Sequence, residues 1–303
     1  MSLLWQQIEN LSQNAQRKVV LAAPFIKVSV LKQIFSYLNP GIKIDCVTRW
    51  LPEDILTGVC DLEIWQVIQA YPAASLWLKS DLHAKYYSFD QRCLVGSANL
   101  TAKGLGLANL ANLELLVQLS TNQPYLQNFE QELFRGAMQV TEDWFDSFQE
   151  LIVKLQPINL TIPLAVNQLV IPSEAWLPKL RNPEELYLAY CGDWDNLTSI
   201  AREAAERDLS SLAIISGLSK TAFKDYIGAL LLQKPIIQQL DIFVKTPQRF
   251  GAICNLLASL PCQNLPDFNP QRDWQTLMRW LLYYLPNRYG VSIPNHSEIF
   301  YRI

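Results

Sequence analysis

Residues 82–114, reading LHAKYYSFDQRCLVGSANLTAKGLGLANLANLE, constrain the fold of this chain more than any other stretch. The aromatic segment 86–89 (YYSF) favours one strand, and the apolar run 93–95 (CLV) is typical of a second, buried strand. A turn at 91–92 would join the two strands. The chain leaves the second strand through 96–99 (GSAN), small residues that let a backbone approach a ligand closely. This pattern predicts a β-hairpin with polar residues placed at its ends.

The polar residues of this hairpin carry groups that suit an anionic ligand. His83 and Lys85 are two positions apart, so in an extended strand their side chains would point to the same side. Ser97 and Asn99 follow the second strand, and Glu114 comes further along the chain. An imidazole, an ammonium, a hydroxyl, a carboxamide and a carboxylate are therefore expected to converge on one small anionic group.

This combination resembles the phospholipase D superfamily, whose motif runs H-x-K-x4-D and continues to a Gly-Ser pair and an Asn. The matching residues are His83, Lys85, Asp90, Gly96, Ser97 and Asn99, with Glu114 in the usual downstream position. Five residues separate Asp90 from Gly96, where the family pattern has six, which we interpret as a shorter hairpin turn. The resemblance covers about the first half of the chain.

The resemblance implies a phosphodiesterase. His83 would attack phosphorus and form a phosphohistidine, and Glu114 would hold the other ring nitrogen and so fix the reactive neutral tautomer. Lys85 and Asn99 would bind the phosphate oxygens, with Ser97 adding a hydroxyl. The resemblance implies no metal and no cofactor, because lysine charge and histidine covalency would replace a metal.

Two further residues belong to the predicted site. Asp90 is the third letter of the motif, but it lies beyond the first strand of the hairpin, so we expect it to hold the loop and not to touch substrate. Arg49 ends another predicted strand. It is interpreted either as a clamp on the substrate or as an ion-pair partner of Asp61 or Glu63.

The chain holds one intact copy of the motif, which leaves open the source of the proton for the leaving group. A two-fold homodimer would bring two His83 side chains face to face, so that the second histidine acts as the acid. The alternative is His296, the only other histidine of the chain. We favour the homodimer, because His296 lacks companions equivalent to Lys85 and Asn99.

The order of apolar patterns predicts an α/β fold, a phospholipase D-like mixed sheet flanked by helices on both faces. Predicted strands cover 18–23, 42–48, 76–79 and 113–119, besides the hairpin. Predicted helices cover 4–15, 30–38, 61–70 and 125–138. Ligands of such sheets bind at the strand ends, where the motif residues are expected.

The sequence divides into a catalytic domain over 1–155, a Pro-rich connector over 156–185 and a second lobe over 186–303. We predict the second lobe to be α/β as well, with strands over 211–216 and 240–245 and another before His296. Its order of elements then repeats that of the first half, and a histidine recurs at a similar point. The lobe is therefore interpreted as a degenerate second copy.

Charge and composition narrow the substrate less than the motif does. The net charge of −3 weakens a nuclease interpretation, because dedicated nucleic-acid binders carry a basic excess. Lys27, Arg49, Lys79, Lys85 and Lys103 are nevertheless expected to give a cleft local positive potential. The leading hypothesis is a metal-independent nuclease, with DNA favoured over RNA. The alternatives are a phospholipid hydrolase or transphosphatidylase, and a module that binds nucleic acid or protein without turnover.

The cellular context is predicted from what the sequence lacks. No signal peptide and no membrane span is recognised, so we expect a cytoplasmic protein without stable membrane association. The six cysteines are scattered and form no C-x-x-C pair, which favours reduced core residues over a zinc site.

Overall fold

The computed structural model describes residues 2–155, 175–212, 214–265, 267–294 and 298–303. The chain forms two compact units, an N-terminal unit over Met1–Glu142 and a C-terminal unit over Asp143–Ile303. Each unit has its own core, and each is described by itself.

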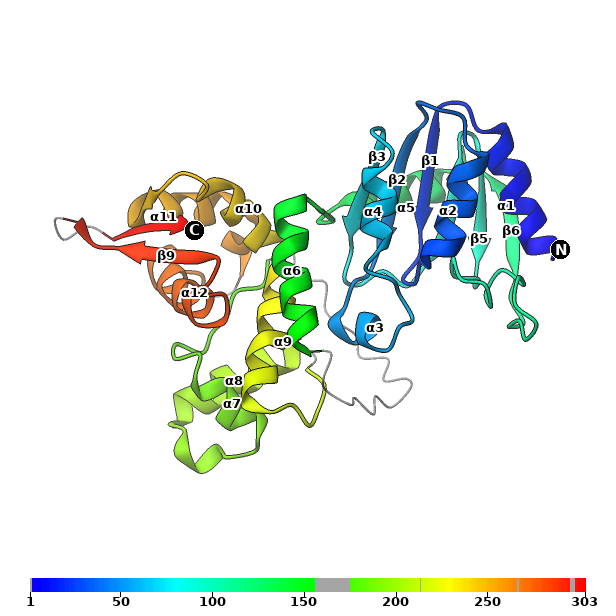
Figure 1. Cartoon of the computed structure of the whole chain (residues 1–303). Helices are drawn as coiled ribbons and strands as arrows, with labels where there is room; N and C mark the ends of the chain where they lie inside the picture. The colour runs from blue at the N-terminus through cyan, green and yellow to red at the C-terminus, as the bar shows by residue number, and fades with distance from the viewer. Residues whose placement is uncertain (1, 156–174, 213, 266, 295–297) are drawn as a thin grey trace. The chain divides into compact units, whose positions relative to one another are not determined.

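The N-terminal unit is built on a seven-stranded mixed sheet with the strand order β6-β5-β4-β1-β2-β3-β7 (Figure 1). Strands β1, β2 and β3 run parallel to one another. Strands β4, β5 and β6 form an antiparallel meander beside β1, and β7 pairs antiparallel with β3 at the other edge. The strands are β1 (Lys18–Ala22), β2 (Lys43–Thr48), β3 (Ala74–Leu78), β4 (Lys85–Phe89), β5 (Arg92–Gly96), β6 (Leu116–Ser120) and β7 (Met138–Gln139).

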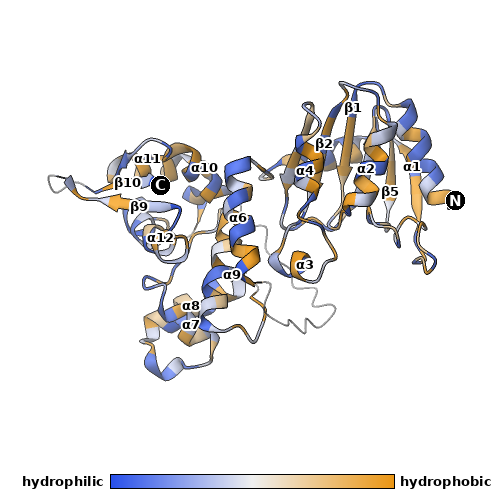
Figure 2. Cartoon of the chain, viewed as in Figure 1, coloured by the Kyte–Doolittle hydropathy of each residue, from blue (hydrophilic) through white to orange (hydrophobic). Residues whose placement is uncertain are grey.

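Helices cover both faces of this sheet. They are α1 (Leu3–Asn14), α2 (Val28–Tyr37), α3 (Pro52–Leu56), α4 (Ile64–Gln69) and α5 (Pro124–Phe134). Helices α2 and α4 lie on one face and α5 on the other (Figure 1). A central strand covered on both sides needs apolar residues at successive positions, and β1 and β2 are accordingly coloured hydrophobic over most of their length (Figure 2). The predicted mixed α/β sheet with helices on both faces is confirmed.

Several local details differ from the sequence prediction. Helix α3 and the edge strand β7 were not predicted. The hairpin turn falls at Asp90 and Gln91, one residue earlier than expected, and Asp90 has a positive φ of 52°. An aspartate tolerates this left-handed conformation better than most residues. Strand β6 begins at Leu116, so Glu114 lies in the loop before it.

The C-terminal unit is mainly helical. Its helices are α6 (Glu142–Leu155), α7 (Glu185–Tyr190), α8 (Ser199–Leu212), α9 (Lys220–Leu232), α10 (Pro235–Phe243), α11 (Phe250–Ser259) and α12 (Pro270–Tyr284). A three-stranded antiparallel sheet in the order β8-β10-β9 completes it, from β8 (Gln248–Arg249), β9 (Tyr289–Ser292) and β10 (Ile299–Arg302). Helix α6 is held in this unit by the Trp144 indole, which donates to the Leu232 carbonyl at 2.8 Å.

Two strands predicted for this half are wrong. Residues 211 and 212 are the last turn of α8, and residues 240–243 belong to α10. Pro235 occupies the first turn of α10, and Ile236, Ile237 and Leu240 share its buried face. A short apolar run of this kind fits a buried helix as well as a strand, which is why the pattern misled. The element order of this unit therefore differs from that of the N-terminal unit, and most of the predicted connector (156–174) lies outside the described residues.

The structure also bears on the predictions about membrane-spanning helices and cysteines. No helix within the described ranges combines the length and the apolar composition that crossing a membrane requires. All six cysteines are free, and five of them are buried as expected for core residues. Cys191 differs, because it is exposed at the end of α7.

Candidate active site

The sheet topology gathers the predicted site residues at one end of the sheet. Strand β4 runs antiparallel to β1, so β4 begins where β1 ends, and Tyr86 pairs with Ala22. The register then places Lys85 opposite Gly96, and Gly96 opposite Leu116. The start of β4 and the residues before it, after β5 and before β6 therefore share this end, which we call the site end: His83, Lys85, Ser97, Asn99 and Glu114.

His83 lies in the loop just before β4 and is exposed. It is outside the strand, so the predicted alternation of side chains does not apply to it. The Lys85 ammonium donates a hydrogen bond to the His83 backbone carbonyl at 2.7 Å, which holds the two residues together. The charge of Lys85 lowers the pKa of the imidazole below its usual 6.5, with smaller contributions from burial and from Arg49. The ring forms no hydrogen bond within the described part of the chain.

Lys85 is the buried cation of the site, with 8% of the residue exposed. Burial lowers the pKa of its ammonium most, the charge of Arg49 lowers it further, and Glu114 acts in the opposite direction. The charge of Arg49 contributes to lowering the pKa of both Lys85 and His83. An anion bound beside these two residues would favour their protonated forms.

Asn99 is positioned by its neighbours in the loop after β5. The Tyr87 hydroxyl donates to the carbonyl of Ala98, the preceding residue. The Asn99 side-chain oxygen accepts a long hydrogen bond of 3.4 Å from the backbone N–H of Phe25, which follows β1. A Cβ on Gly104 would lie 2.7 Å from the Asn99 carbonyl oxygen, so only glycine fits at position 104 in this loop. The carboxamide is thereby fixed at the site end, with its NH2 group available to a ligand.

Glu114 does not orient His83 in this structure. Its carboxylate accepts hydrogen bonds from the Ser97 hydroxyl and, at 3.1 Å, from the Asn112 amide. Ser97 Oγ in turn accepts the backbone N–H of Leu115 at 3.1 Å. The predicted bond from the His83 ring to Glu114 is not formed within the described residues, because Glu114 precedes β6 and β5 separates β6 from β4.

The close approach of the backbone at Leu115 also explains why residue 96 is a glycine. A Cβ there would lie 1.9 Å from the Leu115 carbonyl oxygen, which no side chain permits. The sequence argument assigned the small residues after β5 to the approach of a ligand. At Gly96 the approaching backbone is that of the protein itself.

Asp90 lies at the opposite end of the hairpin. Five positions along the strand separate it from Lys85, which is roughly 16 Å of extended chain. Its carboxylate accepts the backbone N–H groups of Gln16, Arg17 and Lys18 at 2.8, 3.0 and 2.9 Å. Partial burial raises the pKa of Asp90, but the three donors outweigh it and the net pKa is lowered. The structure thus separates Asp90 from the other predicted catalytic residues and shows it holding the chain before β1.

Arg49 directly follows β2 at the site end, and its partner is not one of those predicted. Its guanidinium forms a two-pronged ion pair with Asp54 of α3, at 2.9 and 3.1 Å. Asp61, one of the two partners predicted, instead accepts from the Lys27 ammonium and from the Val28 N–H at 2.8 Å. Burial raises the pKa of Asp54 even though Arg49 opposes the shift. The sequence missed Asp54, although its place five residues after Arg49 in the acidic first turn of α3 was a usable signal.

Comparison with solved structures finds similar chains for about half of this protein. NucT from Helicobacter pylori is 12% identical with a TM-score of 0.37, and the match covers 45% of this chain and 91% of that chain. Nuc from Salmonella typhimurium, described as a phospholipase D family member, is 17% identical with a TM-score of 0.37, over 46% and 91% of the two chains. TrmBL2, an archaeal chromatin protein, is 16% identical with a TM-score of 0.33, over 45% and 49%.

Comparison with family models and with curated proteins gives no match.

Three predictions about the site remain, which concern the cleft cations, a metal and His296. Among the five cations predicted to line a cleft, Lys27 pairs with Asp61 and Lys79 lies 3.6 Å from Asp81, so part of the positive charge is compensated. No group of three or more His, Cys, Asp or Glu residues that could hold a metal is found in the described ranges. His296, the alternative acid, lies outside the described residues.

Proposed function

We propose that this protein is a phosphodiesterase that cleaves nucleic acid through a phosphohistidine intermediate on His83. One observation carries the proposal. An exposed imidazole without a hydrogen-bond partner in the described residues is held beside the ammonium of Lys85, at the strand ends of an α/β sheet. Because Lys85 lowers the pKa of this ring, most of it is neutral near pH 7, which is the nucleophilic form.

Each residue of the site end has a role in the proposed reaction. A ring nitrogen of His83 forms a bond to phosphorus while the bond from phosphorus to the leaving oxygen breaks, and that oxygen takes up a proton from an acid. Lys85 and the Asn99 NH2 group hold the non-bridging oxygens. Water then attacks phosphorus, the P–N bond to His83 breaks, the deprotonated acid takes up the proton of the water, and a phosphate monoester is released. Glu114 fixes the Ser97 hydroxyl, which accepts the Leu115 N–H and contributes to the shape of the oxyanion site.

The acid is proposed to be the His83 of a second copy. The loop that carries Glu114 exposes large apolar side chains, with Leu110 84%, Leu113 103% and Leu115 63% exposed. Contact with another copy of the chain would remove these leucines from water and bring two site ends together. His296 is the alternative acid within one chain.

DNA is the substrate we test first. The same exposed leucines beside the site favour one other candidate, a phospholipid, because an apolar loop next to a phosphate site suits a membrane surface. Release of choline or ethanolamine from phospholipid vesicles without cleavage of DNA would replace the nuclease by a lipid phosphodiesterase.

The experiment uses the purified chain, labelled single- and double-stranded DNA and EDTA. Cleavage is expected for the wild type and is expected to be abolished in His83→Ala, with a phosphate adduct on His83 seen by acid-quench mass spectrometry. The matched control is His296→Ala, the only other histidine. Equal cleavage by wild type and His83→Ala would refute the proposal, and cleavage with no adduct would refute the covalent route.

The same variants identify the acid. If a second His83 supplies the proton, His296→Ala keeps full activity, and Leu113→Asp lowers both the molar mass measured by light scattering and the activity. Loss of activity in His296→Ala with an unchanged monomer mass would assign the acid to His296 instead.

A further inference from the structure

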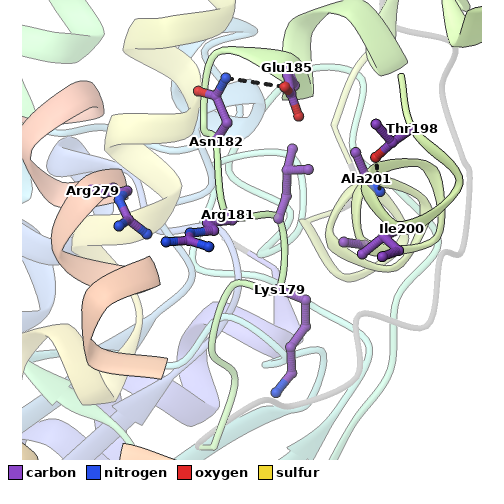
Figure 3. A pocket seen from close by; sticks show the side chains of 10 residues that line it. Lys179, Arg181, Asn182, Glu185, Thr198, Ile200, Ala201 and Arg279 are labelled. Atoms are coloured by element: carbon purple, nitrogen blue, oxygen red, sulfur yellow. Dashed lines mark hydrogen bonds between the residues drawn. The ribbon is translucent and has the colours of Figure 1, made fainter. Parts of the chain in front are cut away.

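The C-terminal unit contains a pocket of about 560 Å³, between helices α7, α8 and α12 and the segment 179–182 (Figure 3). Pockets of about 300–1,000 Å³ are the usual size for small organic ligands. All the residues that line it belong to this one unit. None of them belongs to the site end of the N-terminal unit.

Two arginines in the pocket have no counter-ion among the described residues. Arg181 of the segment and Arg279 of α12 both line it, and their side chains point toward one another in Figure 3. Neither guanidinium makes a hydrogen bond or an ion pair within the described residues. Most other arginines of this unit are paired, as Arg288 is with Asp143 and Asp241. Arg181 is exposed and Arg279 is half-buried, so both charges are open to an anion that enters the pocket and would be attracted by both.

The other charged residues at the pocket do not neutralise this pair. Glu185 accepts a hydrogen bond from the Asn182 amide at 3.2 Å, and Lys179 adds a third cation. The Lys179 ammonium lies 3.9 Å from Asp273, outside the pocket lining, so its charge is partly compensated. The lining therefore carries a net positive charge.

The segment that presents Arg181 is held on two sides. The buried carboxylate of Asp208 in α8 accepts the N–H groups of Lys179 and Leu180 at 2.8 to 3.0 Å. On the other side, the Trp280 indole of α12 donates to the Leu180 carbonyl at 2.8 Å. The backbone is therefore fixed before a ligand arrives, so that binding orders little more than the arginine side chains.

The rest of the wall suits the organic part of a ligand. Ile200, Ala201 and Ala204 line the pocket from the first turns of α8, and Ile200 is 81% exposed. The Thr198 hydroxyl accepts the Ala201 N–H at 3.2 Å and so caps this helix at its N-terminal end. The partial positive charge of that helix end adds to the attraction for an anion.

We propose that this pocket binds a phosphate monoester of nucleotide size, with the phosphate held by Arg181 and Arg279 and the organic body against Ile200 and Ala204. A phosphate monoester carries about −1.5 to −2 charges at pH 7 and three acceptor oxygens, enough to satisfy two forked guanidinium groups. A single carboxylate would neutralise only one of them. The proposal does not depend on the phosphodiesterase activity.

Calorimetric titration of the full-length chain tests the proposal, with AMP, adenosine and inorganic phosphate as separate ligands. AMP is expected to bind, adenosine to bind at least tenfold more weakly, and inorganic phosphate more weakly than AMP. Arg181→Gln and Arg279→Gln are each expected to weaken AMP at least tenfold. Arg249→Gln, which removes the same charge from an exposed site outside the pocket, is expected to leave affinity unchanged.

Further variants separate this pocket from the site end and from misfolding. AMP binding must persist in Lys85→Ala, because a nucleotide bound at the site end would be lost there. Neither Arg181 nor Arg279 has a hydrogen bond or ion pair to lose in the part of the chain that the structure describes, so neither glutamine variant is expected to melt below the wild type. No binding of AMP, binding equal to that of adenosine or of phosphate, or full affinity in both glutamine variants would overturn the proposal.

Discussion

The two ends of the β4–β5 hairpin differ in how the fold treats their polar side chains. At the turn, the Asp90 carboxylate accepts three backbone N–H groups and has no further role to fill. At the site end, the His83 imidazole is exposed and has no hydrogen-bond partner among the described residues, although Lys85 lies beside it. The folded chain thus satisfies one motif residue completely and leaves the other open to a ligand.

The largest expected effect compares the two ends directly. If His83 is the nucleophile as proposed, His83→Ala should reduce phosphodiester cleavage by roughly 10³-fold or more while leaving the melting temperature near that of the wild type, because the side chain is exposed. Asp90→Ala should do the reverse. It should destabilise the fold by about 1–2 kcal/mol and change the activity of the folded fraction by only a few-fold.

Urea unfolding and cleavage assays on the same preparations measure both quantities. If Asp90→Ala removed activity while its free energy of unfolding stayed at the wild-type value, Asp90 would act in the reaction. The proposed difference between a structural Asp90 and a catalytic His83 would then be wrong.

A second comparison sets Asp90 against Asp208, since both carboxylates accept backbone N–H groups. Asp90 is only partly buried, and its pKa is lowered because the donors outweigh desolvation. Asp208 is almost fully buried, and burial raises its pKa to about 7 against the opposition of its donors. The stability that Asp90 contributes should therefore be present above its usual pKa of about 4 and be lost as pH falls further. For Asp208 the folded state keeps a proton that the unfolded state releases, so stability should fall as pH rises from about 4 to about 7.

The asparagine variants test these opposite signs. The stability of wild type relative to Asp208→Asn should decline between pH 4 and pH 7, whereas that of wild type relative to Asp90→Asn should stay constant there and decline only at more acidic pH. Thermal unfolding at half-unit pH intervals provides the measurement. If the two stability differences changed with pH in the same direction, burial would not shift the pKa values of Asp90 and Asp208 in opposite directions.

The smallest effect is a shift in titration at the site end. The chain has only two histidines, so ring-proton NMR with a His296→Gln reference assigns both signals. His83 should titrate below 6.5, and Lys85→Met should raise its pKa because the main cause of the shift is removed. Lys103→Met serves as the control, because Lys103 is exposed and does not contribute to the pKa shift of His83. An unchanged pKa of His83 in Lys85→Met would mean that Lys85 does not lower the pKa of the imidazole.

The strands of the hairpin were predictable because they depend on the preferences of residues that are close together in the sequence. Aromatic and branched residues favour extended backbone, so the two strands followed from a short stretch of chain, and most of the polar residues of the site end lie within or beside that stretch. The second half was harder. Its apolar runs fit buried helices and strands alike, and the segment over 240–243 folds into α10, where a strand was predicted.

What the sequence by itself determined is the set of chemical groups and the β-hairpin that carries them, since both depend on neighbours along the chain. What only the tertiary structure decided is which groups meet. It paired Glu114 with Ser97 and Arg49 with Asp54, and it brought Arg181 and Arg279 to one pocket across about a hundred residues of chain. Such contacts depend on register and on helix packing, which bring together residues whose separation in sequence gives no sign of their distance in space.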